Sequence, residues 1–158
     1  MNPPLQLNSF FLEQLSYRAT PLPEFDPSKP LEERHNVDYD IAPNASGGFT
    51  VRLSLGVTAE PGKNCRCQLT LSLIGFFSMA PGTDDKTRDS MLTLNAPSIL
   101  YGIARQIVAE TTGNGPWGKV FLGTADFVQI AKSKSQARPA VARDTVTAVS
   151  DKPRATSK

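Results

Sequence analysis

The chain has 158 residues, of which 39% are hydrophobic and 20% charged, a composition that suits one globular domain. It contains no apolar run long enough to cross a bilayer, and MNPPLQL lacks the basic-then-apolar order of a secretory signal, so we expect a cytoplasmic protein with no membrane partner. Residues 1–131 hold 10 Lys and Arg against 13 Asp and Glu, whereas residues 132–158 hold 7 against 2. A mildly acidic body argues against direct nucleic-acid binding, and we expect most of the basic tail, residues 132–158, to be disordered.

The first half of the chain predicts four strands. Residues 5–19 alternate and predict a long half-buried strand, with Phe10 and Leu12 as exceptions to an apolar face that holds Leu5, Leu7, Phe11, Leu15 and Tyr17. Residues 20–35 carry four prolines and predict an extended crossover. Residues 36–43, 49–59 and 64–79 alternate again, with a hairpin turn at residues 60–63. We expect residues 81–88 to form a polar loop.

The second half predicts a helix pair over residues 95–131. Asn95 can cap the first helix, with Pro97 in its first turn, and Gly113 and Gly115 end it. The apolar stripe of this helix recurs at three- and four-residue spacing and consists of Ile99, Leu100, Ile103, Ile107 and Val108. A linker rich in Gly and Pro follows, and Thr124 or Asp126 can cap a second, shorter helix that Lys132–Gln136 can complete.

Strands followed by helices indicate an α+β fold, a four-stranded antiparallel sheet covered on one face by two helices. The domain covers residues 1–131. Its remaining apolar surface is large for a monomer of this size, so we expect the chain to form an oligomer.

Motifs for catalysis are weak throughout. Residues 113–119, GNGPWGK, fit the skeleton of a phosphate-binding loop, but Val120 stands where a Ser or Thr would be needed and the loop follows a helix. An NTPase is therefore the weakest alternative. His35 lacks organised partners, and residues 84, 85 and 89 lack the spacing of a calcium loop. Cys65 and Cys67 fit the role of small packing residues. We expect no enzymatic activity, no metal and no cofactor.

The aromatic residues are the most informative. Phe77 and Phe127 fit a core role, whereas Phe25 and Trp117 lie on loops flanked by Pro and Gly, where a partly exposed binding role is as plausible as packing.

The helix pair resembles that of the bacterial export chaperone SecB. The resemblance runs through Pro97, Ile99-Leu100-Tyr101, Ala104-Arg105, Gly115, Leu122 and Phe127, and Gly75-Phe76-Phe77-Ser78-Met79-Ala80 is similar to the family's Gly-Ile-Phe-Ser-Ile-Ala. It covers most of residues 5–131. It implies a homotetramer, a dimer of dimers, that holds unfolded protein without ATP. The implied groove for the client peptide is lined by Phe25, Phe76, Tyr101, Trp117, Phe121 and Phe127.

The chain departs from the export chaperones in charge. Their sheet face carries acidic residues that dock the SecA motor, whereas this chain has Gln14, Arg18, Gln68 and Thr70 at the matching positions, and its tail is basic. Thr124 and Gly118 also replace family prolines. SecA docking is therefore not expected. The pattern is similar to the SecB-like chaperones of toxin–antitoxin–chaperone systems, some of which defend against phage. The expected function is a holdase for a specific client such as an antitoxin, with a general export chaperone as the alternative.

Overall fold

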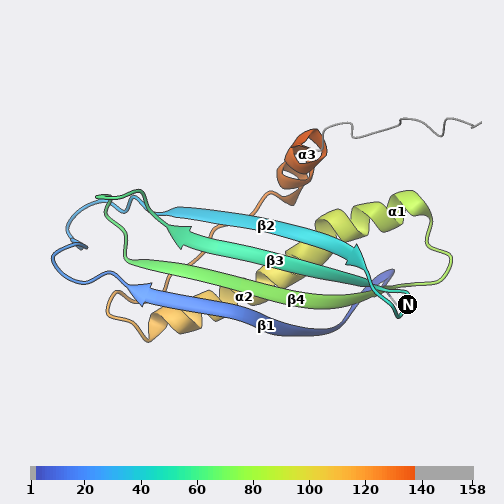
Figure 1. Cartoon of the computed structure of the whole chain (residues 1–158), viewed down its shortest axis with the longest axis horizontal. Coiled ribbons are helices and arrows are strands. Elements are labelled where there is room, and N and C mark those ends of the chain that lie inside the picture. The colour runs from blue at the N-terminus through green and yellow to red at the C-terminus, as the bar shows by residue number, and fades with distance from the viewer. Residues whose placement is uncertain (1–2, 138–158) are drawn as a thin grey trace, which may run out of the picture.

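A computed structural model describes residues 3–137, and Figure 1 shows the arrangement of its elements. Strands β1 (Leu5–Ala19), β2 (Arg34–Pro43), β3 (Phe49–Thr58) and β4 (Cys67–Met79) form one antiparallel sheet in the order β1-β4-β3-β2. Helices α1 (Asp85–Ser90) and α2 (Ala96–Gly113), joined by the π-helical turn η1 (Met91–Asn95), lie on one face, and α3 (Phe127–Ala137) rises beside β2 (Figure 1). The α+β prediction is confirmed.

The core lies between α2 and the two central strands. Alternate residues of β3 and β4 face the helix and are fully buried, among them Val51, Leu53, Leu71, Leu73 and Phe77. From α2, Leu100, Ala104 and Val108 pack into this layer. Gly75 allows the close approach, because a Cβ there would lie 2.8 Å from Leu100 Cδ2. The ladder pairs Leu53 with Leu73 and Leu55 with Leu71, so the predicted apolar faces of both strands are confirmed.

Strand β1 contains two β-bulges that the alternation rule did not predict. The pairing with β4 shifts by one residue between Leu7 and Ser9, and again between Leu12 and Gln14. Between the bulges, at residues 9–12, even-numbered side chains therefore face the helix, whereas odd-numbered ones do so on either side of this segment. Phe10 and Leu12, the two apparent exceptions, pair with Gly75 and Leu73 and so lie on the helix side. Phe11 pairs with Ile74 and lies on the opposite side, so its predicted placement was wrong.

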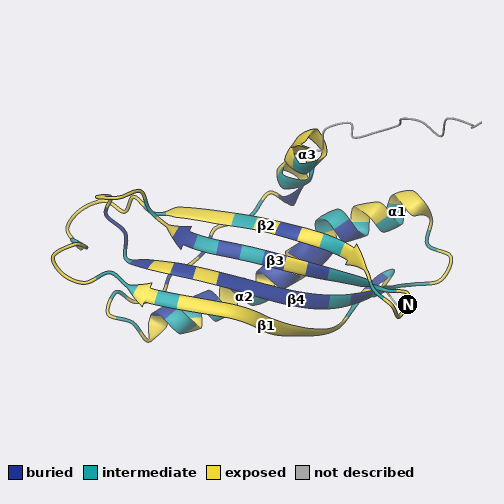
Figure 2. Cartoon of the chain, viewed as in Figure 1, coloured by how far each residue is buried: buried dark blue, intermediate teal, exposed yellow. Residues whose placement is uncertain are grey.

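The expectation that β1 is half-buried was also wrong for the single chain. Figure 2 shows the strand exposed along most of its length. Only Leu5 is buried, because α2 covers the central strands and leaves this edge open. Phe10, Leu12 and Leu15 on the helix side are all exposed.

The helical segment begins ten residues before Asn95, within the stretch predicted as a polar loop. The Asp84 side chain accepts a hydrogen bond from the Thr87 N–H and caps α1, whereas Asn95 lies inside a continuous helical run and caps nothing. Pro97 is accommodated because a π-helical turn immediately precedes it; an α-helix would press the proline ring against a carbonyl one turn earlier. Asp85–Ser90 lacks an apolar pattern that would predict a helix, and none of its residues is buried.

The predicted stripe of α2 divides into two. Leu100 and Val108 are buried with Tyr101 and Ala104, but Ile99 is exposed and Ile103 and Ile107 are only half-buried. The helix ends at Gly113, as predicted, and the following loop returns to the core through Val120, whose N–H donates to the Thr112 hydroxyl at 2.8 Å.

Asp126 rather than Thr124 caps α3, since its carboxylate accepts the Gln129 N–H at 3.0 Å. The helix continues to Ala137, and residues 132–136 complete it as expected. The rest of the predicted disordered tail, residues 138–158, lies outside the described residues.

Strand β4 begins at Cys67, three residues later than predicted, because the β3–β4 loop is wider than a simple hairpin turn. No helix within residues 3–137 has the length and hydrophobicity needed to cross a membrane.

Candidate binding surface

The structure distributes the six aromatic residues of the implied groove over three places. Two lie between the crossover and the α2–α3 linker, three belong to the linker, α2 and the base of α3, and one lies on the other face of the sheet. In that order, they are Phe25 and Trp117; Tyr101, Phe121 and Phe127; and Phe76.

The first place is a closed contact. Phe25 and Trp117 meet edge to face with their ring centroids 4.8 Å apart, and the Trp117 indole N–H donates to the Thr20 carbonyl at 2.8 Å. Phe25 is only 5% exposed, while Trp117 is half-buried. These two loop aromatics therefore pack against each other in the free chain.

The second place is an aromatic cluster beneath α3. The ring of Phe127 lies edge to face with Tyr39 of β2 at 6.0 Å and with Tyr101 of α2 at 5.8 Å. The Tyr101 hydroxyl donates to the Gly123 carbonyl at 2.7 Å and so fixes the linker. All three rings are buried, which makes them the floor of this region. Phe121, on the same linker, points outward and is 73% exposed.

Two hollows flank this cluster along β2. One, of about 410 Å³, is lined by the start of β2, the linker at residues 123–125, Tyr101 and Ile130. The other, of about 900 Å³, is lined by Tyr39, Ile41, Leu94 and Val128 together with residues of α3 and η1. Apolar side chains of β2, the linker and α3 are thus partly open to a ligand over most of the length of the strand.

Lys134 links α3 to the outer strand. Its ammonium nitrogen lies 2.8 Å from Asp38 Oδ1 and 3.6 Å from Asp40 Oδ1, and 5.3 Å from the centre of the Tyr39 ring. Burial acts to lower the pKa of Lys134, but the two carboxylates outweigh it and raise that pKa. The lysine stays charged at neutral pH and holds α3 against β2. No local sequence pattern marks Lys134, because the contact joins residues almost a hundred positions apart.

Phe76 is not part of the same surface. It pairs across the ladder with Ser9 and Thr50 on the helix-free face, where its ring centroid lies 6.0 Å from that of Phe11. The structure therefore does not bring Phe76 together with the other five residues.

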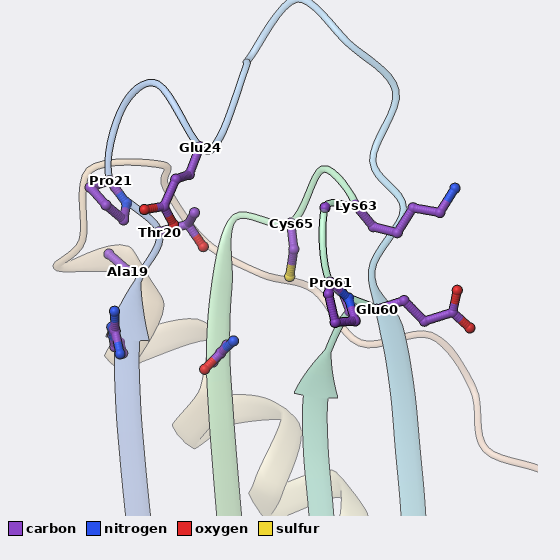
Figure 3. Close-up of a pocket in the computed structure, with 12 residues that line it drawn as sticks. Ala19, Thr20, Pro21, Glu24, Glu60, Pro61, Lys63 and Cys65 are labelled. Atoms are coloured by element: carbon purple, nitrogen blue, oxygen red, sulfur yellow. The ribbon is translucent and has the colours of Figure 1, made fainter.

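A third hollow, of about 500 Å³, lies between the start of the crossover and the β3–β4 loop (Figure 3). Its charged lining is mixed, with Arg18 and Lys63 beside Glu24 and Glu60. This mixture favours no one sign of ligand charge.

Below the crossover, Glu33 and Arg66 form a largely buried ion pair, and His35 Nε2 lies 3.5 Å from the same carboxylate. Burial acts to raise the pKa of Glu33, but the hydrogen bond and the charge of Arg66 outweigh it and leave that pKa below its ordinary value. The pair joins the end of the crossover to the β3–β4 loop.

The cysteines are both free and buried, and burial raises the pKa of Cys67 to about 11, so its thiol is protonated at neutral pH.

No group of metal-ligating side chains occurs within residues 3–137. Asp84 caps α1, and Asp85 and Asp89 pair with Arg88. The GNGPWGK segment follows α2 and leads into the linker rather than opening a helix after a strand, so it has the wrong context for a phosphate-binding loop.

The comparisons with known proteins agree with this architecture. The family model described as "Preprotein translocase subunit SecB" matches residues 1–138. The chain belongs to the SecB family. Its relatives include the protein-export protein SecB of Rhodospirillum centenum, 26% identical over 80% of this chain and 77% of that protein, and that of Rhizobium meliloti, 32% identical over 65% and 64%.

Among solved structures, the chain resembles the SecB-like chaperone Rv1957 of Mycobacterium tuberculosis, which was determined with a ChAD peptide from the antitoxin HigA1. The TM-score is 0.54 at 14% identity, over 77% of this chain and 91% of that one, so the likeness shows the fold. Members of the SecB family are chaperones rather than enzymes, and membership therefore supports a chaperone function.

Replacing Glu33 with Gln should lower the free energy of unfolding at neutral pH and leave it unchanged in acid. Because the pKa of Glu33 lies below its ordinary value of 4.5, the ionised pair contributes stability above that pH, and the contribution is lost as the pH falls through the pKa of the folded state. Urea unfolding followed by Trp117 fluorescence should show a lower midpoint for Glu33→Gln at pH 7, and the difference should vanish in acid.

Glu24→Gln, an exposed change in the same crossover, is the matched control and should leave the midpoint unchanged at both pH values. A Glu33→Gln midpoint equal to that of the wild type at pH 7 would contradict the assigned role of the pair.

Proposed function

We propose that the protein is an ATP-independent holdase that binds non-native polypeptide along β2, the linker and α3. The observation that carries the proposal is the exposure of Phe121 between two buried linker neighbours, Val120 and Leu122, two residues before Gly123, which lines the smaller hollow along β2. An outward aromatic on a linker anchored to the core presents a large apolar contact without loss of the fold.

Binding would follow from burial of apolar surface. An extended client segment laid along β2 would place side chains in the two hollows and against Phe121. At ~25 cal/mol per Å² of apolar surface removed from water, a short segment gains several kcal/mol, enough to compete with aggregation of the client. Tyr101 and Phe127 support this surface from below, and Trp117 extends it toward the crossover.

For the client, we propose a specific aggregation-prone protein such as the antitoxin of a toxin–antitoxin–chaperone system, with phage defence as a further role of such a system. The SecB-like chaperone of M. tuberculosis, whose structure holds an antitoxin peptide, supports this assignment. Genes for a toxin and an antitoxin beside the gene for this protein would support it further.

A general export chaperone is the second candidate, because the curated relatives carry the name protein-export protein SecB. The charge of the sheet argues against it. Gln14, Arg18, Gln68 and Thr70 all lie on the helix-free face, as the ladder pairings show, and none of them is acidic. A basic partner would find no carboxylate at these four positions.

Purified SecA separates the two candidates. We expect its affinity for this protein to be at least about tenfold weaker than for an export SecB, because the favourable charge pairs are missing. Titration by calorimetry at low salt measures it, and comparable affinities for the two chaperones would favour the export function.

The double substitution Phe121→Ser with Val128→Ser should abolish holdase activity. Both side chains are exposed, so the fold should survive, while the lost apolar contact should weaken client binding about tenfold or more. The measurement is suppression of light scattering from an aggregating client, without ATP.

Lys119→Ala is the matched control for this experiment, since Lys119 is exposed on the same linker. It should leave the suppression unchanged, whereas nucleotide binding by the wild type that is lost in Lys119→Ala would support the NTPase alternative. Full activity in the double variant would contradict the assignment of the surface.

We further propose that the chain assembles as a homotetramer, a dimer of dimers, through its uncovered helix side. Phe10, Leu12 and Leu15 of β1 are exposed there, and α2 adds the half-buried or exposed flank of Ile99, Ile103 and Ile107. An apolar surface of this extent favours burial against another copy.

Leu12→Glu together with Ile103→Glu should dissociate this assembly, because charges would be buried at the interface. Light scattering after size exclusion should report about four copies of the 17.1 kDa chain for the wild type and fewer for the variant. Phe121→Ser, on the proposed client surface, should keep the wild-type mass. A monomeric wild type would contradict the proposal.

A further inference from the structure

Asn64, in the β3–β4 loop, holds the crossover in place. Its buried side chain bonds four main-chain groups of the crossover: Oδ1 accepts from the Asp26 N–H at 2.9 Å, and Nδ2 donates to the carbonyls of Asp26, Lys29 and Pro30 at 3.0, 3.2 and 3.1 Å. One side chain therefore bonds the main chain at three positions, 26, 29 and 30, of a segment that belongs to no helix or strand.

The main chain of Asn64 reinforces the same attachment. Its carbonyl accepts the Glu32 N–H at 2.8 Å, and its N–H donates to the Glu32 carboxylate at 3.1 Å. Lys63 pairs with that carboxylate at 2.9 Å, and the Thr20 N–H donates to the Arg66 carbonyl at 2.9 Å. The crossover is thus bound to the β3–β4 loop at both of its ends and in its middle.

This attachment determines the position of Phe25. The crossover has three apolar side chains of any size, and two of them, Leu22 and Leu31, are 65% and 46% exposed. Phe25 alone is buried. It lies directly before the residues that Asn64 binds, and its ring packs against the indole of Trp117. Trp117 is the only tryptophan of the chain and stands on the same linker as the exposed Phe121.

We infer that Phe25 occupies, in the free protein, the place on Trp117 that an aromatic side chain of the client takes, and that Asn64 is the positioning residue that sets how strongly Phe25 competes. The inference rests on the holdase function proposed above. A client then binds only after Phe25 leaves, and its apparent affinity is reduced by the fraction of molecules in which Trp117 is covered. The crossover acts as a tethered competitor, and Phe25 is an occupant of the surface rather than a part of its lining.

The substitution Phe25→Ala separates these two roles. The probe is reduced, carboxymethylated α-lactalbumin, which stays unfolded without denaturant, and its dissociation constant is measured by calorimetry with the full-length chain. A competitor that is removed should tighten binding about fivefold or more. Weaker binding than in the wild type would show Phe25 to be a lining residue and would overturn the inference. Leu31→Ala, an exposed change in the same crossover, is the matched control and should alter nothing.

A second measurement requires no client. Quenching of Trp117 fluorescence by acrylamide should increase in Phe25→Ala and in Asn64→Ala relative to the wild type, because both changes uncover the indole. Asn44→Ala is the control, since Asn44 also bonds neighbouring main-chain groups, but in the β2–β3 turn. Quenching equal to that of the wild type in both variants would overturn the inference, and Phe25→Ala alone decides the point if Asn64→Ala does not fold.

Adding an unfolded probe that contains no tryptophan to Phe25→Ala should lower the acrylamide quenching of Trp117 again, because an aromatic side chain of the client takes the place that Phe25 has left. Failure of the wild type and all variants to bind any probe would overturn the holdase function itself. Binding by the wild type that is weakened in Phe25→Ala would overturn only the present inference.

Discussion

The contact between α2 and β4 is the constraint on which the rest of the structure depends. Leu100 lies over Gly75, where no side chain keeps the helix from the strand, and Ala104 continues this close approach. Because one helix covers only the central strands, β1 keeps apolar side chains that nothing in the described part of the chain covers, and β2 keeps Val37 and Ile41 only half-buried. The uncovered side of β1 and the hollows along β2 are both consequences of this arrangement, and the proposals for assembly and for client binding each depend on one of them.

Much of the fold could be predicted from the sequence wherever the apolar residues keep the regular period of a strand or a helix. Residues of β2 and β3 alternate because one side of the sheet is buried, and α2 ends at Gly113, where the pattern of apolar residues also ends. The rule failed at β1, since two bulges reverse the side of Phe11 without any signature in the residue types. It failed again at α1, where six polar residues form a helix that is specified by the Asp84 cap and by continuity with η1.

The candidate site could be predicted only in part, because residue type does not distinguish an aromatic in the floor of a surface from one that is open to a ligand. The placement of Tyr101 and Phe127 under α3 depends on contacts with Tyr39 that no local pattern contains. Phe76 was grouped with them by resemblance, yet its ladder position puts it on the opposite face. Asn64, Glu33 and Lys134 were missed for the same reason, since each acts through partners that are distant in the chain.

The outer edge of β2 has its own protection. Lys134 comes from the helix side, and Asp38 and Asp40 occupy ladder positions of the opposite side, so their contacts lie at the edge of the last strand. The Tyr39 N–H, which would otherwise be free to pair, donates instead to the Asp38 carboxylate at 2.8 Å. An open strand edge recruits further strands and can seed fibrils. The Lys134 contacts and the occupied Tyr39 N–H therefore keep this edge from acting as a template on which unfolded polypeptides could form further strands.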